Sequence, residues 1–434
     1  MRRSLLNVTI AAMMVAIVSC FSVLPVVGST FPSAEEAKID WGQFKGETIT
    51  MLFNRHPWQE SIEPLIPDFE KLTGMSVKVT VLPEKEFMTK VPADLTAGTF
   101  AFDVFMTQYY DAPQYDLERW TAPLGKYILD PELTDLAWYN WLDFFPAAQK
   151  IATAGGTYED RVAITAEVES IIYRKDVLEG AGLTVPDTFE ELLQAAEKIG
   201  QQTGKSGVVL RGHTTLWWPL YGVVKSYGGD YFTSQYEPVV NSPEMVAGVE
   251  MWNNLMKNGP PGITGFDWEE IVTATVAGQT SMFLDSSGLF SSLLQRGLSP
   301  DKAGIAPFPK GPAGRIPHAH MWSISISSAS KKKAAAWLFI QWATSQEVQF
   351  KQALSGGTLT PRTSALDNPE VIVKNPELTY TVSQGLKAAV LSRPHLKFWE
   401  LMDPLARILQ QVLLGEKEVE PALNEVQKEW ERIF

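Results

Sequence analysis

The sequence contains very little cysteine and histidine. Cys20 is the only cysteine among 434 residues, so no disulfide can form within the chain. Five histidines and one cysteine argue against a structural zinc or iron–sulfur site, which takes about four such ligands. We therefore predict no metal site and no other cofactor.

The sequence also has fewer positively than negatively charged residues. The chain has 37 lysines and arginines against 50 aspartates and glutamates, which gives a formal net charge of −13. The one dense basic run, Lys331–Lys333, fits a solvated helix start. A chain of this charge without a basic stripe would be repelled by a nucleic acid, so the composition argues against a nucleic-acid-binding function.

Motifs of common enzyme classes are absent. The sequence has no Gly-x-Gly-x-x-Gly, His-Glu-x-x-His, Cys-x-x-Cys or Gly-x-Ser-x-Gly motif. The segment Gly200–Ser206 resembles a phosphate-binding loop, but it is one residue short and follows a helix where such a loop follows a strand. We therefore predict that the protein is not an enzyme.

Long hydrophobic runs are missing except at the start of the chain. Arg2 and Arg3 precede an apolar stretch from Leu5 to Val18, as in a secretory signal peptide over residues 1–29. Two alternatives to cleavage after residue 29 remain: a lipobox with a lipidated Cys20, and an uncleaved anchor. No later run approaches the ~20 apolar residues of a membrane span. We expect an exported protein, in the periplasm or at the extracellular face of the cell membrane.

The length and the hydrophobic pattern predict two α/β lobes. A chain of 434 residues exceeds one ordinary domain, and 45% hydrophobic with 20% charged residues is typical of a globular protein. A strand at 49–53, a helix at 62–72 and an alternating strand at 77–81 make a β-α-β unit, which implies a parallel sheet. Pro67 predicts a kink in that helix.

A second run of alternating elements begins with a strand at 170–173. Thr188 and Glu191 form a capping box at the start of a helix that reaches Ile199. Further elements are expected at 243–257 (helix), 281–284 and 324–327 (strands) and 331–350 (one long helix).

Seven short stretches carry a resemblance to a known family. They are Phe69–Gly74, Ala97–Phe105, Ile172–Asp176, Asn241–Glu244, Gly278–Met282, Pro307–Pro312 and Ala335–Phe339. In this order they resemble the extracellular solute-binding proteins of ABC importers, in the sugar-binding branch that includes maltose-binding protein. The resemblance runs from about Glu47 to the C-terminus. It implies a type II periplasmic-binding-protein-like fold, with two α/β lobes around a ligand cleft joined by hinge crossings.

The resemblance also implies how the chain divides. An N-terminal lobe is expected from residues 45–165 with 320–355, and a C-terminal lobe from 166–319 with 356–434. The crossings are expected near 163–170, 305–324 and 355–362. A ligand that contacts both lobes would favour their closure.

The implied function is that of the substrate-binding component of an ABC transporter. It would capture a carbohydrate (a monosaccharide, sugar alcohol or small oligosaccharide) and deliver it to permease subunits. We expect a monomer that meets the membrane only through an N-terminal lipid or anchor.

Candidate ligand-binding residues share two properties: they follow predicted strands or lie on crossing segments, and they offer hydrogen bonds or flat rings. They are Asn54, His56, Trp58, Gln108, Tyr109, Asp111, Glu167, Trp217, Trp218, Asp285, Trp322, Arg362 and Trp399. Glu167 and Trp399 are those that the resemblance places at a sugar-binding carboxylate and a stacking tryptophan of the maltose-binding relative. For His56 the alternative is a loop-capping role, and for Glu167 a hinge hydrogen bond to the backbone.

The segment 106–111 and the segment 285–288 lack aromatic or acidic residues found in the maltose-binding relative, which argues against maltose itself.

Three alternatives to this function stay open. A secreted carbohydrate hydrolase would use Glu167 and Asp285 as a carboxylate pair. A polyamine or a phosphate ester is a further alternative ligand, although the mix of carboxylates, one arginine and several tryptophans favours a neutral polyhydroxy compound.

Overall fold

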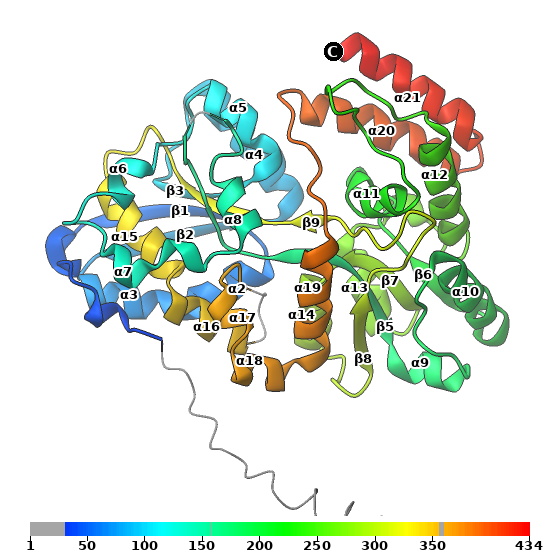
Figure 1. The fold of residues 1–434 in the computed structure, drawn as a ribbon, viewed down its shortest axis with the longest axis horizontal. Helices are drawn as coiled ribbons and strands as arrows, with labels where there is room; N and C mark the ends of the chain where they lie inside the picture. Colours follow the sequence, from blue (N-terminus) through cyan, green and yellow to red (C-terminus); the bar gives the residue numbers. More distant parts are fainter. Residues whose placement is uncertain (1–30, 157, 356–359) are drawn as a thin grey trace, which may run out of the picture.

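The computed structural model of the chain describes residues 31–156, 158–355 and 360–434. The predicted signal peptide at 1–29 and the predicted lipidation of Cys20 lie outside these ranges. The described residues form two sheets, each flanked by helices, in two lobes that lie side by side (Figure 1). The predicted class, two α/β lobes, is confirmed. Within these ranges, no helix combines the length and the apolarity needed to cross a bilayer.

The sheet of the first lobe has the strand order β2-β1-β3-β10-β4. Strands β1 (Thr48–Asn54), β2 (Ser76–Leu82) and β3 (Val104–Gln108) are parallel, as the β-α-β pattern predicts. Strand β10 (Trp322–Ile326) lies antiparallel to β3, and it also pairs with the short β4 (Val162–Ala163). Because β10 enters from the second lobe, its direction is opposite to that of the strands built within the first lobe.

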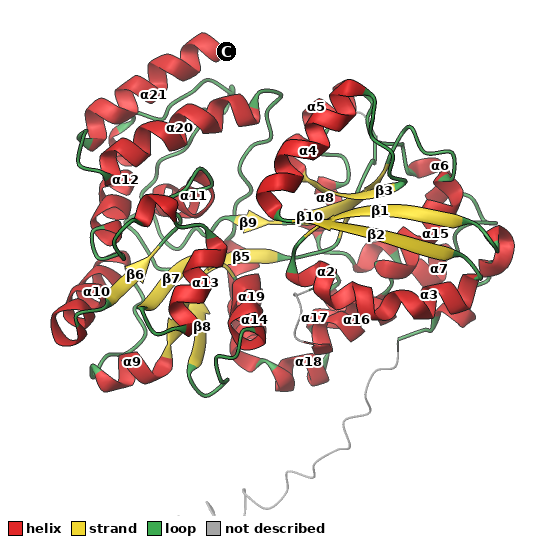
Figure 2. Ribbon diagram, turned by 180° about the vertical axis from the view of Figure 1, so that it is seen from behind, coloured by secondary structure: helices red, strands yellow, loops and turns green. Residues whose placement is uncertain are grey.

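The second sheet has the order β6-β7-β5-β8 (Figure 2). Its strands are β5 (Glu167–Arg174), β6 (Ser206–Val209), β7 (Thr280–Ser286) and β8 (Ala303–Pro307). Strand β5 arrives from the first lobe and runs antiparallel to both of its neighbours, β7 and β8. Only β6 and β7 are parallel.

Two predicted helices of the first lobe are interrupted in the structure. The predicted helix 62–72 becomes α2 (Pro57–Ile62), a 3-10 turn and α3 (Ile66–Thr73), so the proline effect is a break and not only a kink. The predicted helix 331–350 becomes α15 (Lys333–Ala343) and α16 (Gln346–Ser355). The hydroxyl of Thr344 donates to the backbone oxygen of Ile340, which competes with helix continuation.

The remaining helices of the first lobe are mostly short: α4 (Glu84–Ala97), α5 (Ala112–Leu117), α6 (Gly125–Ile128), α7 (Leu136–Tyr139), α8 (Pro146–Ile151), α17 (Thr363–Leu366) and α18 (Pro369–Lys374). Those of the second lobe are α9 (Lys175–Gly180), α10 (Phe189–Thr203), α11 (Trp217–Ser226), α12 (Pro243–Met256), α13 (Trp268–Val276), α14 (Gly288–Gln295), α19 (Pro376–Ala388), α20 (Phe398–Leu413) and α21 (Val419–Ile433). The capping box predicted for α10 is present, with the Thr188 hydroxyl accepting from the Glu191 backbone nitrogen at 3.1 Å.

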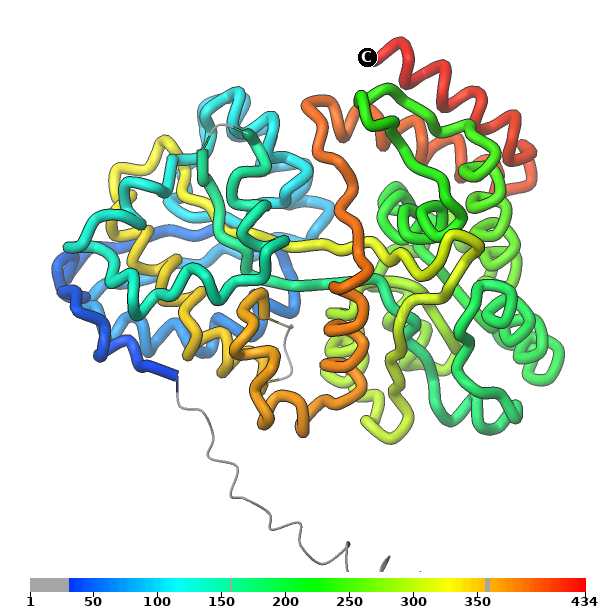
Figure 3. Tube along the Cα trace, in the orientation of Figure 1, coloured from blue at the N-terminus to red at the C-terminus, as the bar shows by residue number. Residues whose placement is uncertain are grey.

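The chain crosses between the lobes three times within the described residues (Figure 3). The first crossing joins β4 to β5, and the second passes through β9 (Ala319–His320) into β10. The third falls between α18 and α19, since α18 packs against α16 whereas α19 packs against β8 and β5. Arg362 and Ser364 are hydrogen-bonded to first-lobe residues, whereas Leu366 belongs to a core cluster with Val168 and Ile172 of β5, so this segment lies at the junction of the lobes.

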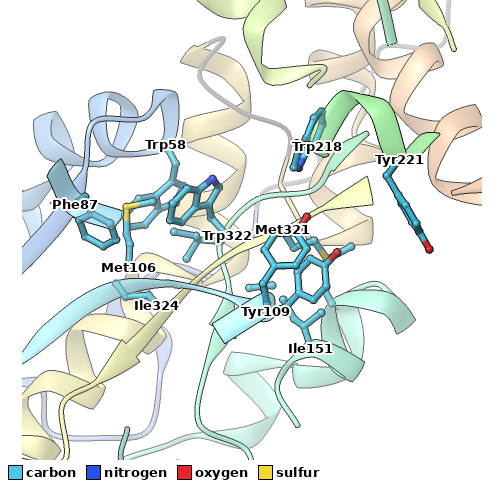
Figure 4. Close-up of a cluster of buried hydrophobic side chains, with 14 of the residues drawn as sticks. Trp58, Phe87, Met106, Tyr109, Ile151, Trp218, Tyr221, Met321, Trp322 and Ile324 are labelled. Atoms are coloured by element: carbon cyan, nitrogen blue, oxygen red, sulfur yellow. The ribbon is translucent and has the colours of Figure 1, made fainter. Parts of the chain in front are cut away.

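Aromatic side chains fill the junction of the lobes. Figure 4 shows part of this cluster, with Tyr109 and Trp322 of the first lobe near Trp218 of α11. Tyr110 stacks on Phe398 with ring centroids 4.6 Å apart, so side chains from both lobes share one apolar core. Offset and edge-on ring contacts of this kind add to the free energy gained from burial.

Candidate ligand-binding site

A cavity of about 510 Å³ lies between the two lobes. This volume is within the ~300–1,000 Å³ typical of small-molecule sites. The first lobe contributes His56, Gln108 and Trp322 to its lining, and the second lobe contributes Trp217 and Trp218. A molecule held here contacts both lobes at once, as ligand-driven closure requires.

Glu167 lies at the base of this cavity, as the first residue of β5 after the crossing. Its Oε2 accepts a hydrogen bond from the Ser286 hydroxyl, and its Oε1 lies 3.2 Å from His56 Nε2. Burial alone would raise the pKa of Glu167, but attraction to His56 and His320 and the Ser286 hydrogen bond lower it to about 2. The carboxylate is therefore charged at neutral pH. His56 Nε2 is thus the polar neighbour of Oε1, and the carboxylate is a charged acceptor on the cavity wall.

His56 has the capping role considered from the sequence, and it also lines the cavity. It is the N-cap of α2, where its Nδ1 accepts from the Trp58 backbone nitrogen at 3.1 Å. The cap fixes the ring so that Nε2 faces Glu167 beside the cavity. The alternative considered for Glu167 was a hinge hydrogen bond to the backbone, but its carboxylate contacts the side chains of His56 and Ser286.

Arg211 supplies the guanidinium of the site. It follows β6, and its Nε and Nη2 donate to the two carboxylate oxygens of Asp285 at 2.7 and 2.8 Å. Asp285 is fully buried on β7, so its carboxylate orients Arg211 and does not face the cavity. The Arg211 Nη1 lies 3.4 Å from Asp267, and the guanidinium carbon lies 5.4 Å from the ring centroid of Trp218. Its net charge toward a ligand is therefore largely neutralised.

Five tryptophan rings line the cavity: Trp217, Trp218, Trp268, Trp322 and Trp399. Two of them are tethered through the indole nitrogen. Trp268 Nε1 donates to Glu84 Oε2 at 2.7 Å, and Trp399 Nε1 donates to Asp111 Oδ1 at 2.7 Å. Such rings offer flat apolar faces, and the carbon-bound faces of sugars and polyols pack on surfaces of this kind.

The tethering carboxyl groups have raised pKa values. Burial raises the pKa of Glu84 to about 7, against the opposing charge of Arg211. Burial also raises the pKa of Asp111 to about 6, although the hydrogen bond from Trp399 and the charge of Arg161 act in the opposite direction.

The structure brings seven of the predicted site residues together on the cavity wall: His56, Gln108, Glu167, Trp217, Trp218, Trp322 and Trp399. The other six lie behind the wall or away from it: Asn54, Trp58, Tyr109, Asp111, Asp285 and Arg362. Asp111 and Asp285 support wall residues through the contacts described above. The Tyr109 hydroxyl contacts His318 and Ser392 instead of the cavity.

Arg362 is a predicted site residue that does not line the cavity. It is fully buried in the first lobe, where it donates to the backbone oxygens of Thr344 (2.8 Å) and Asn140 (2.7 Å). Its guanidinium carbon lies 4.0 Å from the ring centroid of Phe144, and burial lowers its pKa to about 10. The side chain joins loops within one lobe and does not reach the cavity.

The residues of the wall that were not predicted from the sequence include Glu84, Arg211, Trp268 and His320. Glu84 and Arg211 come shortly after the carboxyl ends of β2 and β6, which is the position where open α/β sheets place ligand contacts. His320 precedes Trp322 on the second crossing. Its ring stacks on Tyr110, and burial lowers its pKa to about 4, so it is neutral at pH 7.

Comparison with known proteins gives consistent results. A family model described as bacterial extracellular solute-binding protein matches residues 55–350. An erythritol/L-threitol-binding protein of Mycolicibacterium smegmatis is 27% identical over 341 residues, which are 73% of this chain and 70% of the relative. A probable amino-acid ABC transporter periplasmic-binding protein of Sinorhizobium fredii is 28% identical over 394 residues, 86% of each chain. The crystal structure of an ABC transporter solute-binding protein from Agrobacterium radiobacter with ribitol superposes with a TM-score of 0.79 at 25% identity, covering 90% of this chain and 99% of the other.

Proposed function

Because the chain belongs to the bacterial extracellular solute-binding proteins, we propose that it is the substrate-binding component of an ABC transporter and that its ligand is a small polyol or sugar. In this role the protein is exported, captures its ligand between the lobes and delivers it to permease subunits. Two of the relatives described above bind four- or five-carbon sugar alcohols by name, and their ligands come within the class that this cavity suits.

The observation that carries the proposal is the chemistry of the cavity wall. The Glu167 carboxylate offers a charged acceptor, while the Gln108 amide and the Arg211 guanidinium offer donors. Tryptophan rings supply apolar faces between these polar groups. A polyhydroxy compound matches this mixture, because each hydroxyl both donates and accepts and because its carbon face packs on a ring.

An amino acid is the second candidate ligand, since one relative carries that name. Its α-carboxylate requires a cation that is free to pair with it. Arg211 is already bound through two hydrogen bonds to Asp285, so it offers little net positive charge. The wall therefore favours a neutral ligand.

The hydrolase alternative requires two carboxyl groups that face the same scissile bond. Glu167 lines the cavity, but Asp285 is buried behind Arg211. The pair expected for that chemistry is therefore not presented to a ligand, and the family is one of transport-binding proteins.

A thermal unfolding screen of the purified exported protein tests the proposal. Erythritol, ribitol, mannitol, maltose, glutamine and spermidine represent the competing classes. A ligand at 100 times its Kd adds roughly 2.7 kcal/mol to the free energy of unfolding. A shift with a polyol or sugar, with the ligand recovered intact by mass spectrometry, supports the proposal. A shift with glutamine or spermidine alone refutes the ligand class, and cleavage of maltose refutes the binding role.

A further inference from the structure

Two tryptophans reach across the cavity from the second lobe to the first. Trp268 is the first residue of α13, and its indole nitrogen donates to Glu84 at the start of α4, at 2.7 Å. Trp399 is in the first turn of α20, and its indole nitrogen donates to Asp111, which ends the 3-10 turn after β3, at 2.7 Å. Both hydrogen bonds join a donor in one lobe to a carboxyl group in the other.

The same two rings form part of the cavity wall. An indole has one hydrogen-bond donor, so the bond that links the lobes also fixes the plane of the ring. When the lobes separate, both bonds break and both rings lose this constraint. The apolar faces beside the ligand are therefore complete only in the closed arrangement.

Other contacts between the lobes at the cavity are of a different kind. The contact between His56 and Glu167 joins the first lobe to a residue at the crossing itself, where the separation changes least on opening. The Tyr110–Phe398 contact is an apolar stack near the crossings and has no directional partner. The Tyr109 hydroxyl also contacts the Ser392 hydroxyl at 3.0 Å, but both lie against His318 of the second crossing. The two tryptophan–carboxyl bonds join elements that lie further from the crossings.

We propose that the hydrogen bonds Trp268–Glu84 and Trp399–Asp111 form a two-point clasp, which holds the lobes closed over the ligand and sets both rings against it. The proposal rests on the proposed function for the identity of the ligand, but the clasp itself acts on the equilibrium between open and closed lobes. A hydrogen bond that exists only when the lobes are closed adds its free energy to closure. Loss of one therefore shifts closure measurably.

Ligand release tests the clasp. Trp268→Phe keeps an aromatic ring and removes the donor, and Glu84→Met removes the acceptor. Each is expected to raise the dissociation rate of the bound polyol about tenfold or more. The double variant is expected to dissociate no faster than the single ones, because both changes remove the same bond. Glu84→Gln keeps an acceptor and should restore part of the slow release.

The matched control is Glu86→Met, an exposed residue two positions along α4, which should leave the dissociation rate unchanged. Trp399→Phe and Asp111→Leu form the corresponding pair at the other point of the clasp. Equal dissociation rates in the wild type, Trp268→Phe and Glu84→Met would overturn the proposal. Additive effects in the double variant would overturn it as well.

A second measurement is independent of the ligand's identity. Spin labels at Glu118→Cys and Glu416→Cys, both exposed and on different lobes, report the distance between the lobes by pulsed electron resonance. Without ligand, Trp268→Phe should show a larger population of the long distance than the wild type. If no polyol binds but this shift occurs, the ligand assignment fails and the clasp stands. If polyol binds but neither Trp268→Phe nor Glu84→Met changes the distances between the lobes, the clasp fails and the function stands.

Discussion

Replacing Glu167 by glutamine changes the charge of the cavity while keeping its shape. The carboxylate is ionised at pH 7, because its pKa is lowered to about 2 by His56, His320 and the Ser286 hydroxyl against the effect of burial. Glutamine keeps one acceptor oxygen, but it replaces the other by a group that only donates. The variant therefore removes the charge-assisted part of any hydrogen bond from a ligand hydroxyl.

The size of the effect follows from this exchange. A hydrogen bond to a charged group contributes about 1.5–3 kcal/mol, and one between neutral groups about 0.5–1.5 kcal/mol. With one ligand hydroxyl on the Glu167 carboxylate, Glu167→Gln should cost about 1–2 kcal/mol of binding free energy, or roughly a 5- to 30-fold rise in Kd. Isothermal titration with the polyol found in the thermal screen measures this rise directly.

Glu169→Gln is the matched control on the same strand. Glu169 lies behind the wall, accepts from the His318 backbone nitrogen at 2.8 Å, and has a pKa raised well above its ordinary value, mainly by burial. Glutamine keeps the shape of the side chain and an acceptor oxygen for the His318 backbone nitrogen, and residue 169 does not line the cavity, so this variant should bind with the Kd of the wild type. An unchanged Kd in Glu167→Gln, or an equal rise in both variants, would refute the reasoning.

Two further predictions concern stability. Burial lowers the pKa of His320 to about 4, so between pH 6.5 and 4 the unfolded chain binds a proton that the native protein excludes, and stability falls as the pH is lowered through that window. His320→Gln should reduce the change of the free energy of unfolding with pH by up to about 1.4 kcal/mol per pH unit. Urea unfolding at pH 7, 6 and 5 measures this dependence, and an unchanged dependence would contradict the prediction. A methyl group on Gly222 would lie 1.6 Å from Glu169 Oε2, so Gly222→Ala should lower the free energy of unfolding by at least about 2 kcal/mol. A methyl group on Gly180 would meet no atom within 4 Å, so Gly180→Ala should leave the free energy of unfolding unchanged. Equal unfolding midpoints for the two alanine variants would contradict the prediction.

Local patterns were sufficient to predict much of the fold. The alternation of residues 77–81 and the apolar spacing of 62–72 lie within single elements, and the structure places β2 and α3 there. The break at Thr344 was missed because hydrophobic spacing continues through it, and only the competing hydroxyl marks it. The position of the third crossing depends on which sheet α18 and α19 pack against, and local patterns do not carry that information.

The position of a residue at the end or start of a strand was enough to predict several residues that line the cavity. His56, Gln108 and Trp322 follow or begin strands at the expected edge and line the cavity. Whether a side chain at such an edge faces the cavity depends on partners that are distant in sequence. Asp285 was expected to face the ligand, but Arg211, 74 positions earlier, holds its carboxylate. Glu84 satisfies the same positional rule, but its partner in the other lobe appears only in three dimensions.

The first two crossings are paired with each other as well as with their sheets. Ile164 donates to Trp322, Glu167 is in register with His320, and Glu169 donates to His318, so the two segments form an antiparallel ribbon. Such a ribbon bends easily across its face but resists sliding and in-plane rotation, because both would break several backbone hydrogen bonds together. The lobes are therefore left with one soft direction of movement. Ligand binding in the cavity therefore changes one angle between the lobes. A permease that docks on both lobes can recognise this angle without contacting the ligand.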